Sequence, residues 1–414
     1  MDPRWRIIGK LWRIRSSLPC VGHRIYKIDK CIFVGWSPVR GLVDVLRPDI
    51  LVVGAGISGL MAAVKLARLG FDVLLAEKGP RLAPASSTRN EGWLHAGTYH
   101  ANSIPDRRRA HGVAKGCALG FLQIKTLIPE AVGSEPAIAL VREENRAAEA
   151  EDRWLEFSIP FKRVSVSDFR SRLPLLDHTL IYRAYLVRDA AIDSRILFRF
   201  LSAECNRLQV RTILDCDVRL KNGEASRLVV NGVEMEVEPS VTVVAAGPWT
   251  GDLLGGLDFT VNVRFWKSHI LYGRSLFSQN FFWLDPNECT IINHGETGVI
   301  GLNEDSYPVV DLNATVDRSR ACSVLEAAAR CLPSKVGELE SYSSFACIKV
   351  DIFRDETRRS LDAEVLEFGG RVFCILPGKL TAAPHACDLL VQKVLNCFDD
   401  HRGRFFRPWD SPVE

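Results

Sequence analysis

The stretch 50–77 constrains the fold more than any other part of the chain, because it reads as strand, turn, helix, turn and strand. Residues 50–53 form a short apolar run that suits a parallel strand buried on both faces. Residues 60–69 are rich in alanine and leucine and are expected to be helical, with Gly70 as the C-terminal cap. Residues 73–76 form the second strand. This βαβ order predicts a Rossmann-like α/β domain.

Three glycines, Gly54, Gly56 and Gly59, form a G-x-G-x-x-G pattern between the first strand and the helix. They permit a tight turn, close approach of the backbone to a pyrophosphate, and close packing of helix on strand. The helix N-terminus offers N–H groups to phosphates. Glu77 lies 18 residues after Gly59, the right distance to accept hydrogen bonds from ribose hydroxyls. The unit therefore predicts dinucleotide binding through Gly54, Gly56, Ser58, Gly59, Glu77 and Lys78; the alternative is a glycine cluster that serves helix packing alone.

The residues after the second strand bear on which dinucleotide binds, because the glycine pattern does not separate NAD from FAD. A regular NAD-binding domain continues into another helix and strand. Here residues 78–100, KGPRLAPASSTRNEGWLHAGTYH, form a long irregular run that contains Pro80, Pro84, Gly92 and Gly97. Such a run suits backbone that lies along an extended cofactor.

The run STRNEGWLHAGTYHA, residues 87–101, resembles a Ser/Thr-Arg-Asn-x-Gly run followed by a His-x-Gly step. That pattern is typical of FAD-dependent oxidoreductases of the D-amino-acid oxidase and glycerol-3-phosphate dehydrogenase superfamily. It looks most like the branch of anaerobic glycerol-3-phosphate dehydrogenase and L-2-hydroxyglutarate dehydrogenase. The resemblance implies FAD as cofactor, with residues 86–90 along the ribityl and phosphates and 92–97 beside the flavin ring. The implied binding residues are Ser86, Ser87, Thr88, Arg89, Asn90 and Gly92.

Four further segments extend the resemblance over most of residues 49–395. Residues 185–201 look like the family's acidic turn and helix, in which Asp193 or Ser194 caps the helix. The strand VRTILDCDV, residues 210–218, is expected to lie against adenine, and an apolar strand ends at residues 245–247. A strand, a Pro-Gly turn and a helix near the C-terminus bring Gly378-Lys379-Leu380-Thr381 to the flavin. These segments add Val218, Ala246, Gly247, Gly378, Lys379, Leu380 and Thr381 to the implied cofactor site.

Some sequence features of related flavoenzymes are missing from this chain. It has no cysteine-rich tail for an iron–sulfur cluster, no second glycine pattern for NADPH and no redox Cys-x4-Cys pair. These differences argue against a disulfide reductase and against an enzyme that binds two nucleotides. No cysteine spacing suits a metal site, so none is predicted.

The residues between the segments expected to bind flavin show a different pattern of polar and apolar residues. A polar helical stretch at 142–157 and short alternating strands between 263 and 302 predict an antiparallel sheet with helices, an α+β substrate domain interleaved with the Rossmann-like domain. The predicted division is a basic extension at 1–48, a discontinuous FAD-binding domain at 49–135, 181–262 and 359–414, and a substrate domain at 136–180 and 263–358.

Charge and composition exclude some partners. Residues 1–47 hold ten lysines and arginines against three acids, a formal charge of +7, whereas the remainder is net −4. This extension is a candidate for peripheral contact with anionic lipid or for targeting; the alternative is a segment that precedes the real domain. No apolar run approaches the roughly 20 residues of a membrane helix. The twelve scattered cysteines suit a reducing compartment such as the cytoplasm, and nothing indicates nucleic-acid binding.

Candidate catalytic groups follow from the expected chemistry, in which hydride leaves a carbon that bears a hydroxyl or an amine. His95 is the first candidate for a general base. Lys349 and Arg354 precede the last flavin segment and are candidates to hold a substrate carboxylate or phosphate, since relatives place a cation there. Weaker candidates are Tyr99, His100, Lys267 and His269.

The sequence thus predicts an FAD-dependent dehydrogenase or oxidase that acts on a small 2-hydroxy acid, a polyol phosphate or an amino acid. Its electron acceptor, whether a quinone, a carrier protein or O2, is left open. The alternatives are an amine or amino-acid oxidase of the same fold that produces H2O2, and a flavin-binding subunit without catalysis.

Overall fold

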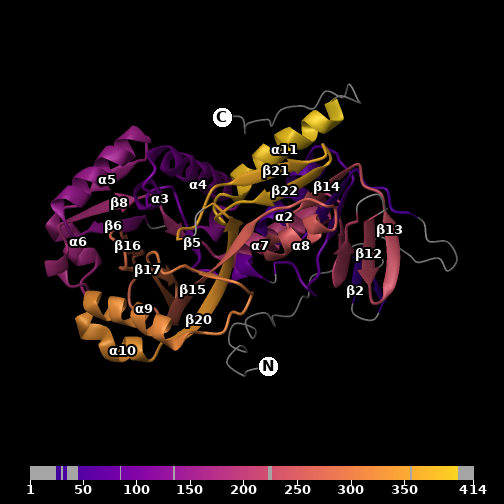
Figure 1. The fold of residues 1–414 in the computed structure, drawn as a ribbon. Coiled ribbons are helices and arrows are strands. Elements are labelled where there is room, and N and C mark those ends of the chain that lie inside the picture. Colours follow the sequence, from indigo (N-terminus) through magenta and orange to yellow (C-terminus); the bar gives the residue numbers. More distant parts are fainter. Residues whose placement is uncertain are drawn as a thin grey trace.

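The computed structural model describes residues 45–83, 85–133, 136–221, 226–354 and 357–399, and the backbone of a hairpin formed by β1 (Ile25–Ile28) and β2 (Cys31–Val34). Most of the predicted basic extension, and its expected lipid contact, lie outside these residues. The chain forms two halves, one around a parallel sheet and one around a larger, mainly antiparallel sheet (Figure 1). Among the described residues, no helix combines the length and apolar character needed to span a bilayer.

A six-stranded sheet forms the first half, and its mostly parallel strands show a Rossmann-like α/β arrangement. Five neighbouring strands run parallel, and the last strand at one edge is antiparallel. In sheet order the strands are β10 (Arg211–Ile213), β4 (Val73–Ala76), β3 (Ile50–Val53), β14 (Val241–Val244), β22 (Val372–Leu376) and β21 (Glu364–Phe368). The Rossmann-like domain expected from the sequence is confirmed.

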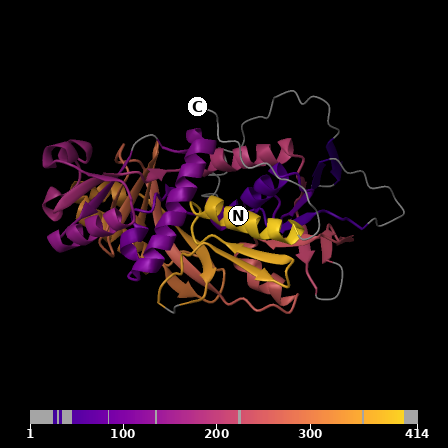
Figure 2. The same cartoon turned by 90° about the horizontal axis from the view of Figure 1, so that it is seen from above.

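The two faces of this sheet are covered by different layers, which explains why β3 is apolar at every position. Ile50 and Val52 pack on the side of three helices, α2 (Ile57–Arg68), α7 (Ser194–Arg207) and α11 (Ala383–Asp399). Leu51 and Val53 point to the other side and pack against a three-stranded antiparallel sheet. Figure 2 shows α11 lying along the sheet. The three strands are β11 (Cys216–Arg219), β12 (Ser226–Val230) and β13 (Val233–Val237), with α8 (Thr250–Gly255) nearby.

The segment VRTILDCDV forms two strands, not the single strand expected from its apolar pattern. Residues 211–213 pair with β4 in the parallel sheet, whereas residues 216–219 pair with β12 in the three-stranded sheet. Asp215 adopts a φ of 51° between them and turns the chain out of the first sheet. The change of direction lets the Cys216 N–H donate to the Glu77 carbonyl oxygen.

The second half is a nine-stranded sheet that is antiparallel except where β16 pairs with β6. An α+β sheet with helices was expected here, and the observed fold confirms it. Its strands are β6 (Ala137–Val141), β7 (Phe161–Arg163), β8 (Arg183–Val187), β15 (Val263–Arg274), β16 (Phe281–Trp283), β17 (Cys289–His294), β18 (Thr297–Leu302), β19 (Tyr307–Val309) and β20 (Ser343–Ile352). Its helices are α5 (Glu144–Glu156), α6 (Val166–Arg172), α9 (Arg318–Cys331) and α10 (Val336–Glu340).

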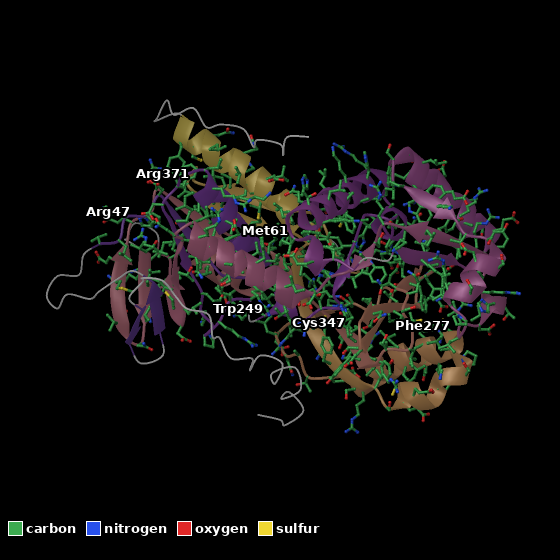
Figure 3. The ribbon with its side chains drawn as sticks, turned by 180° about the vertical axis from the view of Figure 1, so that it is seen from behind. Arg47, Met61, Trp249, Phe277, Cys347 and Arg371 are labelled. Carbon is green, nitrogen blue, oxygen red and sulfur yellow. The ribbon has the colours of Figure 1, made fainter. Side chains whose placement is uncertain are left out.

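The domain boundaries drawn from sequence remain a prediction, and the strand pairing bears on one of them. Strand β8 falls in the 181–262 block assigned to the FAD-binding domain, yet it pairs with β6 and β7 in the nine-stranded sheet. Between the halves lie a short pair of strands, β5 (Trp93–Leu94) and β9 (Ala190–Ala191), and two helices, α3 (His100–Ser103) and α4 (Arg107–Leu127). Cys347 on β20 lies between Met61 in the first half and Phe277 in the second (Figure 3).

Candidate active site

A cavity of about 710 Å³ begins at the glycine turn and continues to the junction of the two halves. Its size and its position at the carboxyl ends of parallel strands are typical of ligand sites in α/β folds. It brings together most of the residues expected from the sequence. These are Gly54, Gly56, Ser58, Glu77, Lys78, Ser86, Ser87, Asn90, His95, Val218, Ala246, Gly247, Lys349, Gly378, Lys379 and Leu380.

The glycine turn leaves no room for side chains on its inner side. Gly54 has a φ of 100°, and a Cβ atom there would lie 2.6 Å from the Ala245 carbonyl oxygen. A Cβ atom on Gly59 would lie 1.8 Å from the Gly54 carbonyl oxygen, so Gly59 serves the turn without lining the cavity. The first turn of α2 consequently opens into the cavity, and the N-terminus of a helix favours a phosphate.

The Glu77 carboxylate is fixed at the end of β4 by two backbone amides. Ala55 N–H donates to Oε2 and Gly79 N–H donates to Oε1, each over 2.7 Å. Each carboxylate oxygen keeps further acceptor capacity. The arrangement holds an acceptor for hydroxyl groups at this end of the cavity.

The polar run after β4 is held in an irregular shape by its own side chains. Asn90 accepts a hydrogen bond from Gly92 N–H over 2.8 Å and donates to the Ser87 carbonyl oxygen over 2.9 Å. Ser87 Oγ accepts from Ile57 N–H over 3.0 Å at the start of α2. Ser86 donates to the carbonyl oxygen of Ile348 on β20 over 2.7 Å. The run therefore connects the glycine turn to the antiparallel half.

Five of the predicted site residues besides Gly59 lie outside the cavity lining. Thr88 and Arg89 are exposed, because the short 3-10 turn at 86–88 directs them away from the cavity. Gly92 and Thr381 lie behind the lining; Thr381 Oγ1 accepts from His95 N–H over 3.0 Å. Arg354 is half exposed and donates to Glu364 from Nε over 3.1 Å. Direct contact of these five with a cofactor or substrate stays a prediction.

Three cations and one carboxylate gather at the end of the cavity opposite Glu77. Lys349 Nζ lies 3.2 Å from Oε1 of Glu91. Burial would raise the pKa of Glu91, but the nearby Lys349 and Lys379 outweigh it and hold that pKa at about 2. Arg359 donates to both carboxylate oxygens of buried Asp351, over 2.7 and 2.8 Å. Glu91, Lys349, Arg359 and Lys379 are called the charged end below.

Lys379 differs from the other two cations. Its backbone N–H donates to the Pro377 carbonyl oxygen over 2.7 Å, but its ammonium group has no hydrogen bond or ion pair to any residue in the described part of the chain. Burial lowers its pKa, and the positive charges of Arg359 and Lys349 lower it further, to about 7. Its ammonium group is therefore partly protonated at neutral pH and open to a ligand.

His95 lines the same end of the cavity and is placed by Asp189. The Asp189 carboxylate is fully buried and lies 3.8 Å from His95 Nδ1. It accepts hydrogen bonds from Trp93 Nε1 and from the Thr98 hydroxyl. Burial, and then the charge of Lys379, lower the pKa of His95 although Asp189 opposes the shift. A neutral imidazole at neutral pH is suited to accept a proton.

The weaker candidates lie elsewhere. His100 is buried behind His95, with ring centres 4.6 Å apart, and burial holds its pKa well below the usual value. Tyr99 also lies outside the lining. Lys267 and His269 alternate on β15 with Ser268, which faces Cys347, so both point away from the face that carries Lys349. His269 Nε2 instead accepts from Asp317 N–H at the start of α9, over 2.9 Å.

Sequence reasoning missed three residues of this arrangement: Glu91, Asp189 and Arg359. Glu91 lies inside the run that carried the resemblance, and Asp189 lies in the acidic turn just before Asp193, so both had a local signal. Arg359 is five residues after Arg354 in a segment rich in arginine. Composition does not distinguish the arginine that pairs with buried Asp351 from the one that faces solvent.

Comparison with known proteins gives a consistent result. Residues 49–371 match the family model described as "DAO: FAD dependent oxidoreductase". Over 109 residues the chain is 27% identical to "L-2-hydroxyglutarate dehydrogenase, mitochondrial" of Arabidopsis thaliana, covering 22% of this chain and 23% of that protein. Over 240 residues it is 27% identical to "Anaerobic glycerol-3-phosphate dehydrogenase subunit A1" of Haloferax volcanii, covering 52% and 39%. The chain spans less than half the length of these curated relatives.

Solved structures of low sequence identity share the fold. Glycine oxidase from Geobacillus kaustophilus superposes with a TM-score of 0.67 at 19% identity, covering 85% of this chain and 95% of that one. L-alpha-glycerophosphate oxidase from Mycoplasma pneumoniae, with FAD bound, has a TM-score of 0.69 at 16% identity and covers 84% and 95%. At these identities the likeness extends to the fold alone.

Proposed function

Because the chain belongs to the family of FAD-dependent oxidoreductases, we propose that it removes hydride from a small 2-hydroxy acid, polyol phosphate or amino acid. The observation that carries this proposal is a single cavity that joins the glycine turn to a charged end with a histidine. The names of the curated relatives, a hydroxyglutarate and a glycerol-3-phosphate dehydrogenase, support the hydroxy-acid and polyol-phosphate classes. Of the two structural neighbours, glycine oxidase supports oxidation of an amine and glycerophosphate oxidase supports a polyol phosphate.

The residues present fit FAD, the cofactor of this family. The crowded glycines Gly54 and Gly59 leave backbone, not side chain, facing the cavity at the start of α2, as a pyrophosphate requires. The fixed carboxylate of Glu77 offers acceptors for ribose hydroxyls. The cavity then continues past Ser86 and Asn90 to Lys379, which suits a long, two-part cofactor. When bound, FAD accepts the two electrons and the hydrogen that leave the substrate as hydride.

His95 is proposed as the base that takes the proton from the substrate hydroxyl or ammonium group. Its Nδ1 faces Asp189, so a proton on Nδ1 leaves Nε2 as the basic nitrogen. The lowered pKa keeps the ring neutral at neutral pH. The proton that His95 accepts and the hydride that leaves carbon together balance oxidation of an alcohol to a carbonyl group or of an ammonium group to an iminium ion.

Lys379 is proposed to balance the charge of the substrate's acidic group, with Lys349 and Arg359 as further hydrogen-bond donors beside it. Ammonium and guanidinium groups form strong hydrogen bonds with carboxylates and phosphates, and such bonds strengthen where water is excluded. Lys349, Arg359 and Lys379 all line the cavity close to His95 in the chain's fold. Electrons then pass from reduced FAD to a quinone, a carrier protein or O2.

Anaerobic reduction of the bound flavin tests the proposal without assuming an acceptor. The purified holoenzyme is mixed with 2-hydroxy acids, glycerol 3-phosphate and amino acids, and the loss of flavin absorbance is followed. We expect one class to bleach the flavin in wild-type protein, and His95→Gln to retain FAD but reduce it at least tenfold more slowly. The proposal is overturned if no compound of the three classes bleaches the flavin, and the role of His95 if its variant reacts at the wild-type rate.

A further inference from the structure

We infer that the substrate of this site carries a single carboxylate, and that substrates with two negative charges are disfavoured. This inference rests on the proposed function and narrows it, because polyol phosphates and 2-hydroxy dicarboxylates are dianions. It follows from the charged end of the cavity, where carboxylates of the protein already pair with two of the three cations.

Two of the three cations are neutralised by the chain. Lys349 is paired with Glu91 over 3.2 Å, and the side chain of Glu91 is only about a quarter exposed at 27%. Arg359 is paired with Asp351 through two hydrogen bonds, and both side chains are almost completely buried. Each pair carries no net charge, so neither offers an uncompensated cation to a substrate.

Lys379 is the remaining cation. Within the described residues, no carboxylate pairs with it, and it lines the cavity together with Glu91, Lys349 and Arg359. The charged end therefore has one positive charge in excess when Lys379 is protonated. One carboxylate would neutralise it, whereas a second negative charge would enter a buried site without a partner, which is strongly unfavourable.

Glu91 strengthens the discrimination because its charge is permanent. Positive neighbours keep its pKa at about 2, so it is ionised at every pH at which the protein would be assayed. A carboxylate accepts hydrogen bonds from a hydroxyl or an ammonium group but repels a second anion. The site is thus complementary to a monocarboxylate whose neighbouring carbon carries a hydroxyl or an ammonium group.

Binding of small anions to the FAD-loaded protein tests the inference apart from turnover. Acetate and glycolate serve as monoanions, and malonate and sulfate as dianions; binding is followed by the change in flavin absorbance under anaerobic conditions. We expect the monoanions to bind at least about tenfold more tightly at pH 6.5, because only one cation is free. Tighter binding of the dianions would overturn the inference and leave the proposed function standing, whereas a holoenzyme that binds and is reduced by neither class overturns both.

A charge-changing pair of variants makes the test specific. Glu91→Gln frees the charge of Lys349, so the preference should move at least about tenfold toward the dianions. Glu364→Gln removes a carboxylate that pairs with Arg354 outside the cavity and should leave the preference unchanged. Lys379→Met, made with Glu91 intact, removes the free cation and should weaken acetate binding at least about tenfold. An unchanged preference in Glu91→Gln, or unchanged acetate binding in Lys379→Met, contradicts the inference.

Discussion

The Asp189 carboxylate lies 3.8 Å from Nδ1 of His95 and is completely buried. Trp93 and Thr98 donate hydrogen bonds to it and fix its position. It comes from the end of β8, in the antiparallel half, whereas His95 follows β5. The relationship makes Asp189 a positioning residue for the proposed base, since a neighbouring carboxylate selects the tautomer and orientation of a histidine.

Asp189→Asn should slow flavin reduction by roughly tenfold to a hundredfold, part of the contribution of a general base. Loss of the carboxylate also removes a charge that raises the pKa of His95, so the acid limb of the rate profile should move to lower pH. The check is the rate of anaerobic flavin reduction from pH 5 to 9, with FAD content measured in parallel. A lower rate with an unshifted profile would indicate a merely structural role.

The two arginines at 354 and 359 should behave differently. Arg359→Met leaves the buried Asp351 carboxylate without a partner, which should cost about 3–5 kcal/mol of unfolding free energy. Arg354→Met breaks a half-exposed pair with Glu364 and should cost less than about 1 kcal/mol. Thermal and urea unfolding of the two variants measure the difference. In the double variant Arg359→Met/Asp351→Leu most of the lost stability should return, because no buried charge is left unpaired.

Substrate binding should weaken as the pH rises through about 7. The pKa of Lys379 is lowered to about 7, so its ammonium is charged below that pH and neutral above it. An anion that depends on this charge should bind with a constant affinity below about pH 6 and lose up to about tenfold per pH unit above 7. Its titrating or charged neighbours are Arg359, Lys349, Glu91 and Cys117, together with His95 and His100, whose pKa values its charge lowers. In Lys379→Arg, whose guanidinium stays charged, this dependence should disappear; its persistence would point to a different group.

Replacement by alanine should have opposite effects at two helical glycines, one at the glycine turn and one on α4. Gly59→Ala places a Cβ atom 1.8 Å from the Gly54 carbonyl oxygen, which should destabilise the protein by about 3 kcal/mol or more and abolish FAD retention. Gly112 on α4 has open space around it, so Gly112→Ala should be neutral or stabilise the helix by about 0.5–1 kcal/mol. Melting temperature and flavin absorbance after gel filtration report both effects. A stable, yellow Gly59→Ala protein would contradict the close packing seen here.

Glu77→Ala should weaken FAD retention. The change removes acceptors for ribose and leaves the N–H groups of Ala55 and Gly79 without their partner, so we expect at least about tenfold weaker binding. Asp72→Ala, at the other end of β4, loses only an exposed pair with Arg211 and should retain FAD normally. Fluorescence of free FAD after dialysis gives the dissociation constants, and equal retention by both variants would contradict the role of Glu77.

The local part of the site could be predicted from sequence because its signals are short in range. The glycine spacing, the apolar run at 50–53 and the acid at 77 form one βαβ unit, and each has a distinct backbone requirement. The antiparallel half was also expected, because alternating strands are visible in the sequence. These elements need no knowledge of distant contacts.

The charged end could not be predicted in the same way because its partners are far apart in the chain. Glu91 and Lys349 meet across 258 residues, and His95 and Asp189 lie beside two paired strands, β5 and β9, that are far apart in the chain. Which of Arg354 and Arg359 belongs to the site depends on which side chain is buried beside Asp351. The face of the sheet on which Lys267 lies depends on the register of β15 with β20. Long-range pairing of this kind has no local pattern.

The strand order of the parallel sheet has a consequence for how the protein is made. Strand β3 is formed from residues 50–53, but β22, two places away in the sheet, comes from residues 372–376. Helix α11, which covers β3 and α2, is later still. Strand β3 and the glycine turn are therefore synthesised some 300 residues before the strand and helix that complete the sheet around them. Such a sequence separation favours slow folding. FAD is expected to act as a late ligand that captures the finished sheet, so supply of riboflavin during expression should limit the yield of folded protein.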